Sequence, residues 1–223
     1  MNIEPIAELR SPLKEKFGIP RQAGIAGSLH GTIVLKAPYN VPDALRGLEE
    51  FDWLWLIWGF SLNPARPQGA PFEATVRPPR LGGNRRIGVF ASRSPFRPNG
   101  LGLSAVRIIS IDAAHGRIEV AGADLADGTP IYDIKPYVEY ADSKPGARSG
   151  FVDSHEWRRL KVKFPEDYAE RFPPEELEAL EEILAEDPRP QFQHDPDRIY
   201  GLSFGGHEIK FRVRGDTLEV LRG

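Results

Sequence analysis

The sequence predicts a mainly β protein: a β-barrel followed by a small C-terminal α+β domain. Short runs rich in β-branched and aromatic residues recur through the first two thirds of the 223 residues, and only one helix signal interrupts them. The 22 Gly and 21 Pro are spread along the chain and mark many turns. Many short strands with few helices are typical of a barrel or sandwich, and closing the sheet removes its exposed edges.

The strands of the barrel are expected where these runs lie between clusters of Pro, Gly, Asn and Asp. The predicted strands are residues 6–9, 31–35, 54–60, 74–76, 87–91, 103–111, 117–122 and 131–135. Residues 112–116 are typical of a hairpin connection. The single helix expected in this part covers residues 43–50, because Pro42 suits the first turn of a helix.

A change in composition predicts a domain boundary. Residues 140–154 are rich in Ser, Gly, Pro and charge and are interpreted as a linker, so we divide the chain into a barrel over 1–147 and a C-terminal domain over 148–223. In the second part we expect a strand over 157–164, a helix starting at Pro173-Pro174, and strands over 208–213 and 217–221. This part is small for independent stability, so we expect it to pack on the barrel or on a second subunit.

Composition excludes several classes of protein. Without Cys there are no disulfides, thiolate zinc sites or thiol catalysis, and the five His lack ligand spacing, so no metal site is expected. The longest apolar run, 54–60, is too short to span a membrane, and residues 1–5 do not resemble a signal peptide, so we expect a cytoplasmic protein without membrane contact. Residues 100–105 match G-x-G-x-x-A but lack the strand before and the helix after that a dinucleotide site needs.

Positive charge is concentrated in one stretch. Residues 74–111 contain seven Arg and no Asp or Glu, whereas the rest of the chain has 22 basic and 32 acidic residues. Arg suits phosphate, carboxylate and stacked bases, so this stretch is typical of an anion or nucleic-acid site. The alternative is that these Arg residues pair with acids elsewhere in the fold.

Polar residues lie between Gly and Pro in three segments, 11–22, 77–99 and 124–137, which we interpret as loops at strand ends, where sites are usually built. Each alone has an ordinary explanation. Asp127-Gly128 suits a hairpin turn, Arg93 and Arg97 suit surface ion pairs, and residues 20–22 suit a solvated loop.

Together, these segments resemble the TsaA-like, or YaeB-like, tRNA methyltransferases. The similarity extends over nearly the whole chain, from Arg10-Ser11-Pro12 through the Arg-rich segment and Asp127-Gly128-Thr129-Pro130 to Asp187-Pro188-Arg189-Pro190. The resemblance implies a β-barrel that binds S-adenosylmethionine without a Rossmann fold and assembles as a homodimer. It also implies N6-methylation of N6-threonylcarbamoyladenosine at position 37 of threonine tRNAs.

The resemblance also implies which residues contact the methyl donor. These are Pro20, Arg21, Gln22, Ser61, Leu62, Arg93, Leu103, Leu125, Ala126, Asp127 and Gly128. Relatives have His-Gln where this chain has Ser61-Leu62, and this pair cannot copy those hydrogen bonds.

The residue chemistry suggests roles. Arg93 or Arg21 could bind the donor carboxylate with a guanidinium fork, and Asp127 could accept from its ribose hydroxyls or ammonium. The catalytic base is unknown. The candidates for removing the N6 proton are Asp133, Lys135 in its neutral form and Tyr137.

The remaining cations are candidates for binding the tRNA. Arg97 or Lys135 could pair with the threonyl carboxylate of the modified base. The Arg residues proposed to bind tRNA are Arg77, Arg80, Arg85, Arg86 and Arg97. Two alternatives stay open: a non-enzymatic RNA-binding β-barrel, and a methyltransferase of the same fold acting on another acceptor.

Overall fold

Six antiparallel strands close into a barrel in the computed structural model, which describes residues 3–64, 71–78, 85–154, 158–190, 193 and 195–222. The strand order around the barrel is β1-β2-β7-β6-β3-β8. The strands are β1 (Ala7–Arg10), β2 (His30–Leu35), β3 (Trp53–Gly59), β6 (Leu101–Asp112), β7 (Arg117–Ala121) and β8 (Pro130–Pro136). The predicted mainly β, barrel-containing fold is therefore confirmed.

Alternation along the strands decides which side chains fill the barrel. In β3, Leu54, Leu56 and Trp58 are buried inside, while Trp55 and Ile57 point outward. On the outer face, Ile57 lies opposite Leu103 of β6 and Asp133 of β8. The inner residues join one hydrophobic cluster with Ile33, Val106, Ile118, Val120 and Ile131.

Three connections leave the barrel at the same end. They are the β1–β2 connection over 11–29, the β3–β6 connection over 60–100, and the β7–β8 connection over 122–129. The antiparallel register requires this, because Arg10 pairs with Thr32, Gly59 with Leu101 and Trp58 with Ile131. The three polar segments singled out in the sequence therefore meet at, or begin from, this end of the barrel.

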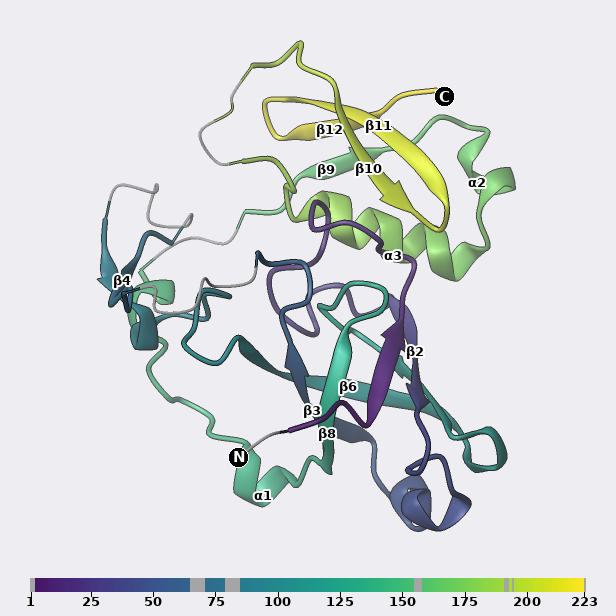
Figure 1. The fold of residues 1–223 in the computed structure, drawn as a ribbon. Helices are drawn as coiled ribbons and strands as arrows, with labels where there is room; N and C mark the ends of the chain where they lie inside the picture. Colours follow the sequence, from purple (N-terminus) through teal and green to yellow (C-terminus); the bar gives the residue numbers. More distant parts are fainter. Residues whose placement is uncertain are drawn as a thin grey trace.

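The long β3–β6 connection carries a small sheet of its own. Strand β4 (Thr75–Val76) pairs with β5 (Ile87–Gly88), and a 3₁₀ turn, η4 (Val89–Ala91), follows. Figure 1 shows β4 at the side of the molecule, away from the barrel strands. The predicted strand over 87–91 is thus shortened to two residues.

The C-terminal part is a four-stranded sheet with two helices. The sheet order is β10 (Tyr200–Phe204), β11 (His207–Arg214), β12 (Thr217–Val220) and β9 (Lys161–Lys163), with β9 parallel to β12. Helix α2 (Tyr168–Arg171) precedes α3 (Pro174–Ala185), which buries Leu180, Ile183 and Leu184 as its sequence pattern predicts. Figure 1 shows α3 between this sheet and the barrel.

Residues 13–29, which lie before β2, contribute to the core of this C-terminal part. Leu13, Ala26 and Leu29 are buried in the same hydrophobic cluster as α3 and the strands β10 to β12. The backbone N–H of Gly205 donates to the carbonyl of Pro12 at 3.2 Å, and the N–H of Ser28 donates to Glu182 Oε2 at 2.8 Å. The β1–β2 connection therefore joins the barrel to the C-terminal sheet. The division at 147/148 stays a sequence prediction.

Several local elements differ from the sequence predictions. The helix expected over 43–50 is wrong: two 3₁₀ turns, η1 (Pro42–Leu45) and η2 (Leu48–Glu50), are separated by Gly47 in the left-handed region at φ 84°. Strand β10 was not predicted. The expected linker begins with a short helix, α1 (Glu139–Asp142), and contains the turn η6 (Gly150–Val152). The turn η5 (Ala113–His115) joins β6 to β7.

Candidate active site

Two of the predicted donor-binding segments meet at the end of the barrel. The guanidinium of Arg93 donates a hydrogen bond to Gln22 Oε1, across 71 positions of sequence. Pro20 is buried, which anchors this loop, whereas Arg21 and Arg93 are exposed. Because the amide oxygen of Gln22 is neutral, the charge of Arg93 remains available to an anionic ligand.

A buried hydrogen-bonded chain leads from the inside of the barrel to this loop. Trp58 Nε1 donates to Ser104 Oγ at 2.9 Å, and Ser104 Oγ donates to Asp124 Oδ1 at 2.6 Å. The Asp124 carboxylate also accepts from the backbone N–H of Ala23, next to Gln22. Asp124 therefore connects residues 20–23, which we call the donor loop after their predicted role, to the barrel wall.

Burial controls the titration of Asp124. Loss of solvent raises the pKa of this carboxyl, and its hydrogen bonds, with the nearby charge of Arg93, offset only part of that effect. Asp124 belongs to one of the polar segments but was not among the predicted site residues. Nothing in its sequence neighbours shows that Ser104, twenty positions away, is a buried partner.

The predicted contact residues 125–128 form a turn anchored to the β1–β2 connection. Asp127 Oδ1 accepts from the N–H of Ser11 at 3.1 Å, and the N–H of Asp127 donates to the carbonyl of Leu13 at 2.7 Å. Leu125 and Ala126 are buried, and Gly128 takes a left-handed conformation at φ 73° that favours glycine. One carboxylate oxygen of Asp127 therefore has a structural partner.

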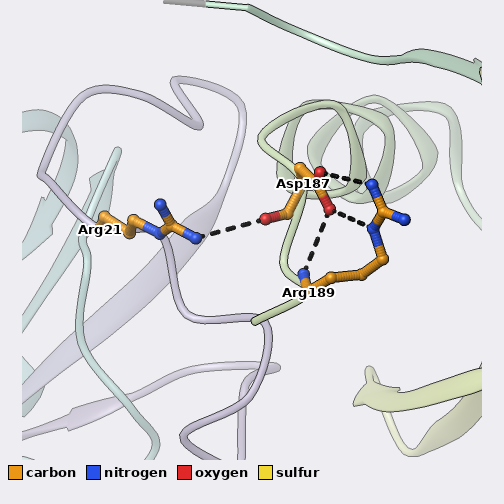
Figure 2. Close-up of polar contacts among 3 residues, drawn as sticks. All are labelled: Arg21, Asp187 and Arg189. Atoms are coloured by element: carbon orange, nitrogen blue, oxygen red, sulfur yellow. Dashed lines mark hydrogen bonds and ion pairs between the residues drawn. The ribbon is translucent and has the colours of Figure 1, made fainter. Parts of the chain in front are cut away.

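Arg21 is held from the C-terminal side (Figure 2). Its guanidinium donates to the backbone carbonyl of Asp187 at 3.4 Å. The carboxylate of Asp187 in turn accepts from Arg189 Nε and from a terminal guanidinium nitrogen of Arg189, both at 2.8 Å. These bonds raise the pKa of the nearly buried Arg189. The backbone of Asp187 itself is left-handed, with φ 51°.

Ser61, Leu62 and Leu103 lie at the same end but are more open. Ser61 and Leu62 are exposed directly after β3, where the N–H of Phe60 donates to the carbonyl of Gly100 at 3.0 Å. Leu103 is exposed on the outer face of β6.

Two of the three candidate bases lie on β8, and the third lies just beyond its end. Asp133 and Lys135 are exposed on the outer face, opposite Ile57 and Trp55. Tyr137 lies beyond the strand, where its N–H donates to the carbonyl of Trp53 at 2.9 Å and its ring packs 5.7 Å from Trp55. Among the three, Asp133 therefore lies nearest to the end of the barrel that carries the predicted donor-binding residues. Tyr137 of the same chain lies toward the opposite end.

The predicted tRNA-binding arginines differ in whether their side chains already have partners in the structure. Arg77, Arg85 and Arg86 are exposed beside β4 and β5, and no ion pair joins them to an acid in the part of the chain that the structure describes. Arg97 donates to the carbonyls of Ser92 at 2.7 Å and Val89 at 3.4 Å, so it braces its own loop. Arg80 lies outside the described residues.

Neither a metal centre nor a membrane span is found in the described ranges. No group of three or more His, Asp or Glu residues there could hold a metal ion. No helix among these residues is both long and apolar enough to cross a bilayer.

The sequence is similar to bacterial proteins that are named as methyltransferases. The chain is 40% identical over 228 residues to a Pseudomonas aeruginosa protein, RcsF, named as a candidate S-adenosylmethionine-dependent methyltransferase, covering 99% of this chain and 96% of that protein. It is 38% identical over 228 residues to the Escherichia coli tRNA (adenine(37)-N6)-methyltransferase, covering 97% and 95% of the two chains.

A solved structure and two family models agree with these relatives. The crystal structure of TrmO from Pseudomonas aeruginosa superposes with a TM-score of 0.79 at 34% identity, covering 99% of this chain and 97% of that one. Residues 8–143 match the tRNA-methyltransferase O N-terminal domain, and residues 158–222 match the TrmO C-terminal domain. Together with the barrel and the convergence of its loops, these matches show that the chain belongs to the tRNA-methyltransferase O family.

Proposed function

We propose that this protein transfers a methyl group from S-adenosylmethionine to N6 of N6-threonylcarbamoyladenosine at position 37 of threonine tRNAs. The observation that carries the proposal is the contact between Gln22 and Arg93, which joins two predicted donor segments beside Asp124. The names of the relatives support the same reaction class, since they include a tRNA (adenine(37)-N6)-methyltransferase.

The residues at this end of the barrel fit the chemistry of the donor. Arg93 offers further guanidinium donors for the carboxylate, and Arg21 is a second exposed cation at the other side of the loop. The carboxylates of Asp124 and Asp127 suit the ammonium and ribose hydroxyls. Backbone groups of residues 125–128 can contact the adenine edge, because Gly128 permits close approach.

Methyl transfer from a sulfonium is an in-line displacement in which the acceptor nitrogen attacks the methyl carbon and the C–S bond breaks. Holding the two reactants in line can lower the barrier by about 7–11 kcal/mol. The donor loop suits this task, because it is anchored at Ala23 by Asp124 and at Arg21 by the carbonyl of Asp187.

The modified base supplies its own recognition group. The carbamoyl carbonyl makes the N6–H more acidic, and Asp133, neutral Lys135 or Tyr137 could accept that proton; among them Asp133 lies nearest the donor loops. The threonyl carboxylate needs a cation, for which Arg97 and Lys135 are the candidates. Arg77, Arg80, Arg85 and Arg86 are proposed for the tRNA phosphates.

We also propose a homodimer that acts in the cytoplasm. The outer face of β3 and β6 supports the dimer, because large apolar residues are exposed there. Trp53 lies on the same face of β3 as Trp55 and Ile57, and Leu103 of β6 lies opposite Ile57. A second copy would remove this apolar surface from water. Light scattering of the purified protein tests the assembly: a mass of one chain contradicts it.

The experiment that tests the reaction compares two forms of one tRNA. Methyl transfer from labelled S-adenosylmethionine is measured with a threonine tRNA carrying the threonylcarbamoyl group and with its unmodified transcript. We expect transfer to the modified tRNA only, because an unmodified adenosine leaves a cation unpaired and has a less acidic N6–H. Comparable rates contradict the proposed acceptor, and absence of donor binding in a calorimeter favours a non-enzymatic RNA-binding protein.

A further inference from the structure

Three phenylalanines are exposed around the loop that carries Arg93. Phe72 is 51% exposed, Phe90 is 70% exposed and Phe96 is 58% exposed. The rings of Phe72 and Phe90 are stacked, with centroids 6.0 Å apart. Single exposed apolar residues are ordinary on protein surfaces, but several large rings gathered on one segment indicate a binding surface.

Two of these rings have cations beside them. The guanidinium carbon of Arg97 lies 5.9 Å from the centroid of Phe90, and Lys16 Nζ lies 5.6 Å from the centroid of Phe96. Lys16 is fixed by a 2.8 Å hydrogen bond to Asn63 Oδ1, and Asn63 Nδ2 donates to the carbonyl of Pro95 at 3.4 Å. The rings therefore lie on a braced loop with positive charge at their sides.

The positive charge of the surrounding segment indicates an anionic partner. Residues 74–111 contain no acid, and Arg77, Arg85 and Arg86 have no ion pair to an acid within the described residues. Exposed rings together with unneutralised arginines fit single-stranded nucleic acid, whose bases stack and whose phosphates are anionic. A second copy docking face to face here would bring like charges together, which is unfavourable.

We propose that Phe90 and Phe96 stack on unpaired bases of the tRNA anticodon loop, beside the adenosine that is methylated. This inference rests on the proposed function. The position follows from the chain, because Phe96 is three residues after Arg93, and Arg93 contacts the donor loop through Gln22. Bases that stack here would hold the target nucleotide next to the donor, with Lys16 and Arg97 available to the adjoining phosphates.

The test separates stacking from charge. Binding of an anticodon stem-loop RNA is measured over a range of salt concentrations for Phe90→Ala, Phe96→Ala and the ring-preserving Phe90→Tyr and Phe96→Tyr. Each Ala variant should bind about 5- to 150-fold more weakly with an unchanged salt slope, because base–aromatic stacking carries no charge. The Tyr variants should bind like the wild type. Phe51→Ala is the matched control, since Phe51 is also exposed but precedes β3 at the opposite end of the barrel.

Two further measurements keep the outcomes distinct. Calorimetry with S-adenosylmethionine should give the same affinity for all variants, and light scattering should give the same mass. Unchanged RNA affinity in both Ala variants overturns the inference, and a changed mass overturns it in favour of an interface between copies. If RNA binding follows the stacking pattern but the wild type transfers no methyl group, the stacking of Phe90 and Phe96 on RNA stands and the proposed function fails.

Discussion

Arg93 is the residue whose surroundings best fit binding of an anionic group. Its hydrogen bond to Gln22 is made to a neutral oxygen, so this contact does not neutralise the guanidinium charge. The charge of Arg93 lowers the pKa of the nearby Asp124 carboxyl, but burial of that carboxyl raises its pKa by more. An ordinary surface salt bridge, the simplest alternative for this residue, is not found for Arg93 in the described part of the chain.

We expect Arg93→Ala to weaken binding of S-adenosylmethionine by about 1.5–3 kcal/mol, the usual cost of losing a hydrogen bond to a charged group. Titration calorimetry measures this affinity, and thermal unfolding checks the fold. Arg107→Ala removes another exposed arginine, on β6 far from Gln22, and should leave donor affinity unchanged. Equal affinities for the wild type and Arg93→Ala would assign Arg93 a structural role.

Asp124 makes stability depend on pH in a direction opposite to that of most carboxylates. Its pKa is raised in the folded state above the ordinary value of 3.8, so the folded protein holds this proton more tightly than the unfolded chain. The contribution of this group to stability is therefore fully present below pH 3.8 and is lost as pH rises through the raised pKa.

Asp124→Asn removes this titration while keeping the shape of the side chain. Relative to the wild type, we expect the variant to gain stability as pH rises above 3.8, and the difference to level off once Asp124 is ionised. Urea unfolding at a series of pH values measures the difference. A stability difference that falls over this range would mean that the pKa of Asp124 is lowered instead.

The sequence identified the segments that meet at the candidate site but not all of the residues that anchor them. Pro20, Gln22 and Arg93 could be selected because their motifs resemble a known family, and the structure brings Gln22 and Arg93 into contact. The role of Asp124 could not be predicted, since it depends on the burial of Ser104 and on the loop that places Ala23 nearby. Such effects arise from tertiary packing, which local patterns do not encode.

At the scale of elements, the strands with clear alternation were predictable and the short ones were not. Strand β3 alternates Leu54, Leu56 and Trp58 with outward residues, and its position is confirmed. The helix expected over 43–50 fails because Gly47 adopts a positive φ that ends one turn before the next begins. Strand β10 was missed because Gly201 and Ser203 have little strand preference, and only pairing with β11 makes the segment extended.

We predict that the arginines beside the small sheet of β4 and β5 contribute to tRNA binding. Replacing Arg85 and Arg86 together by Ala should weaken tRNA binding and reduce the slope of log K against log salt by about 0.7–0.9 for each phosphate that is no longer neutralised. Donor affinity should be unchanged, because neither residue is among the predicted donor contacts. The control replaces Arg107 and Arg117, two exposed arginines of β6 and β7, which changes the net charge equally. An unchanged slope in the Arg85/Arg86 variant would mean that this sheet does not face RNA.

At the scale of the whole molecule, the barrel and the C-terminal sheet share residues 13–29. Leu13 is fully buried in the C-terminal cluster although it follows β1 of the barrel closely. We expect Leu13→Ala to cost about 2–5 kcal/mol of stability.

Hydrogen exchange locates the effect of that substitution. Amides of α3 and β10 should lose protection in Leu13→Ala, because their shared cluster is weakened. Leu9→Ala is the matched control, since Leu9 is equally buried but belongs to the barrel cluster, and it should act mainly on barrel strands. Loss of protection confined to the barrel in both variants would contradict the shared core.

The position of residues 13–29 also affects the order of events during protein synthesis. A ribosome releases the chain from its N-terminus, so the donor loop emerges early, before β9 to β12 and α3 exist. Until those last elements are made, Leu13 and Leu29 have no core to enter and Arg21 has no carbonyl of Asp187 to bind. Residues 13–29 therefore complete their packing only near the end of translation, after the rest of the barrel has been made.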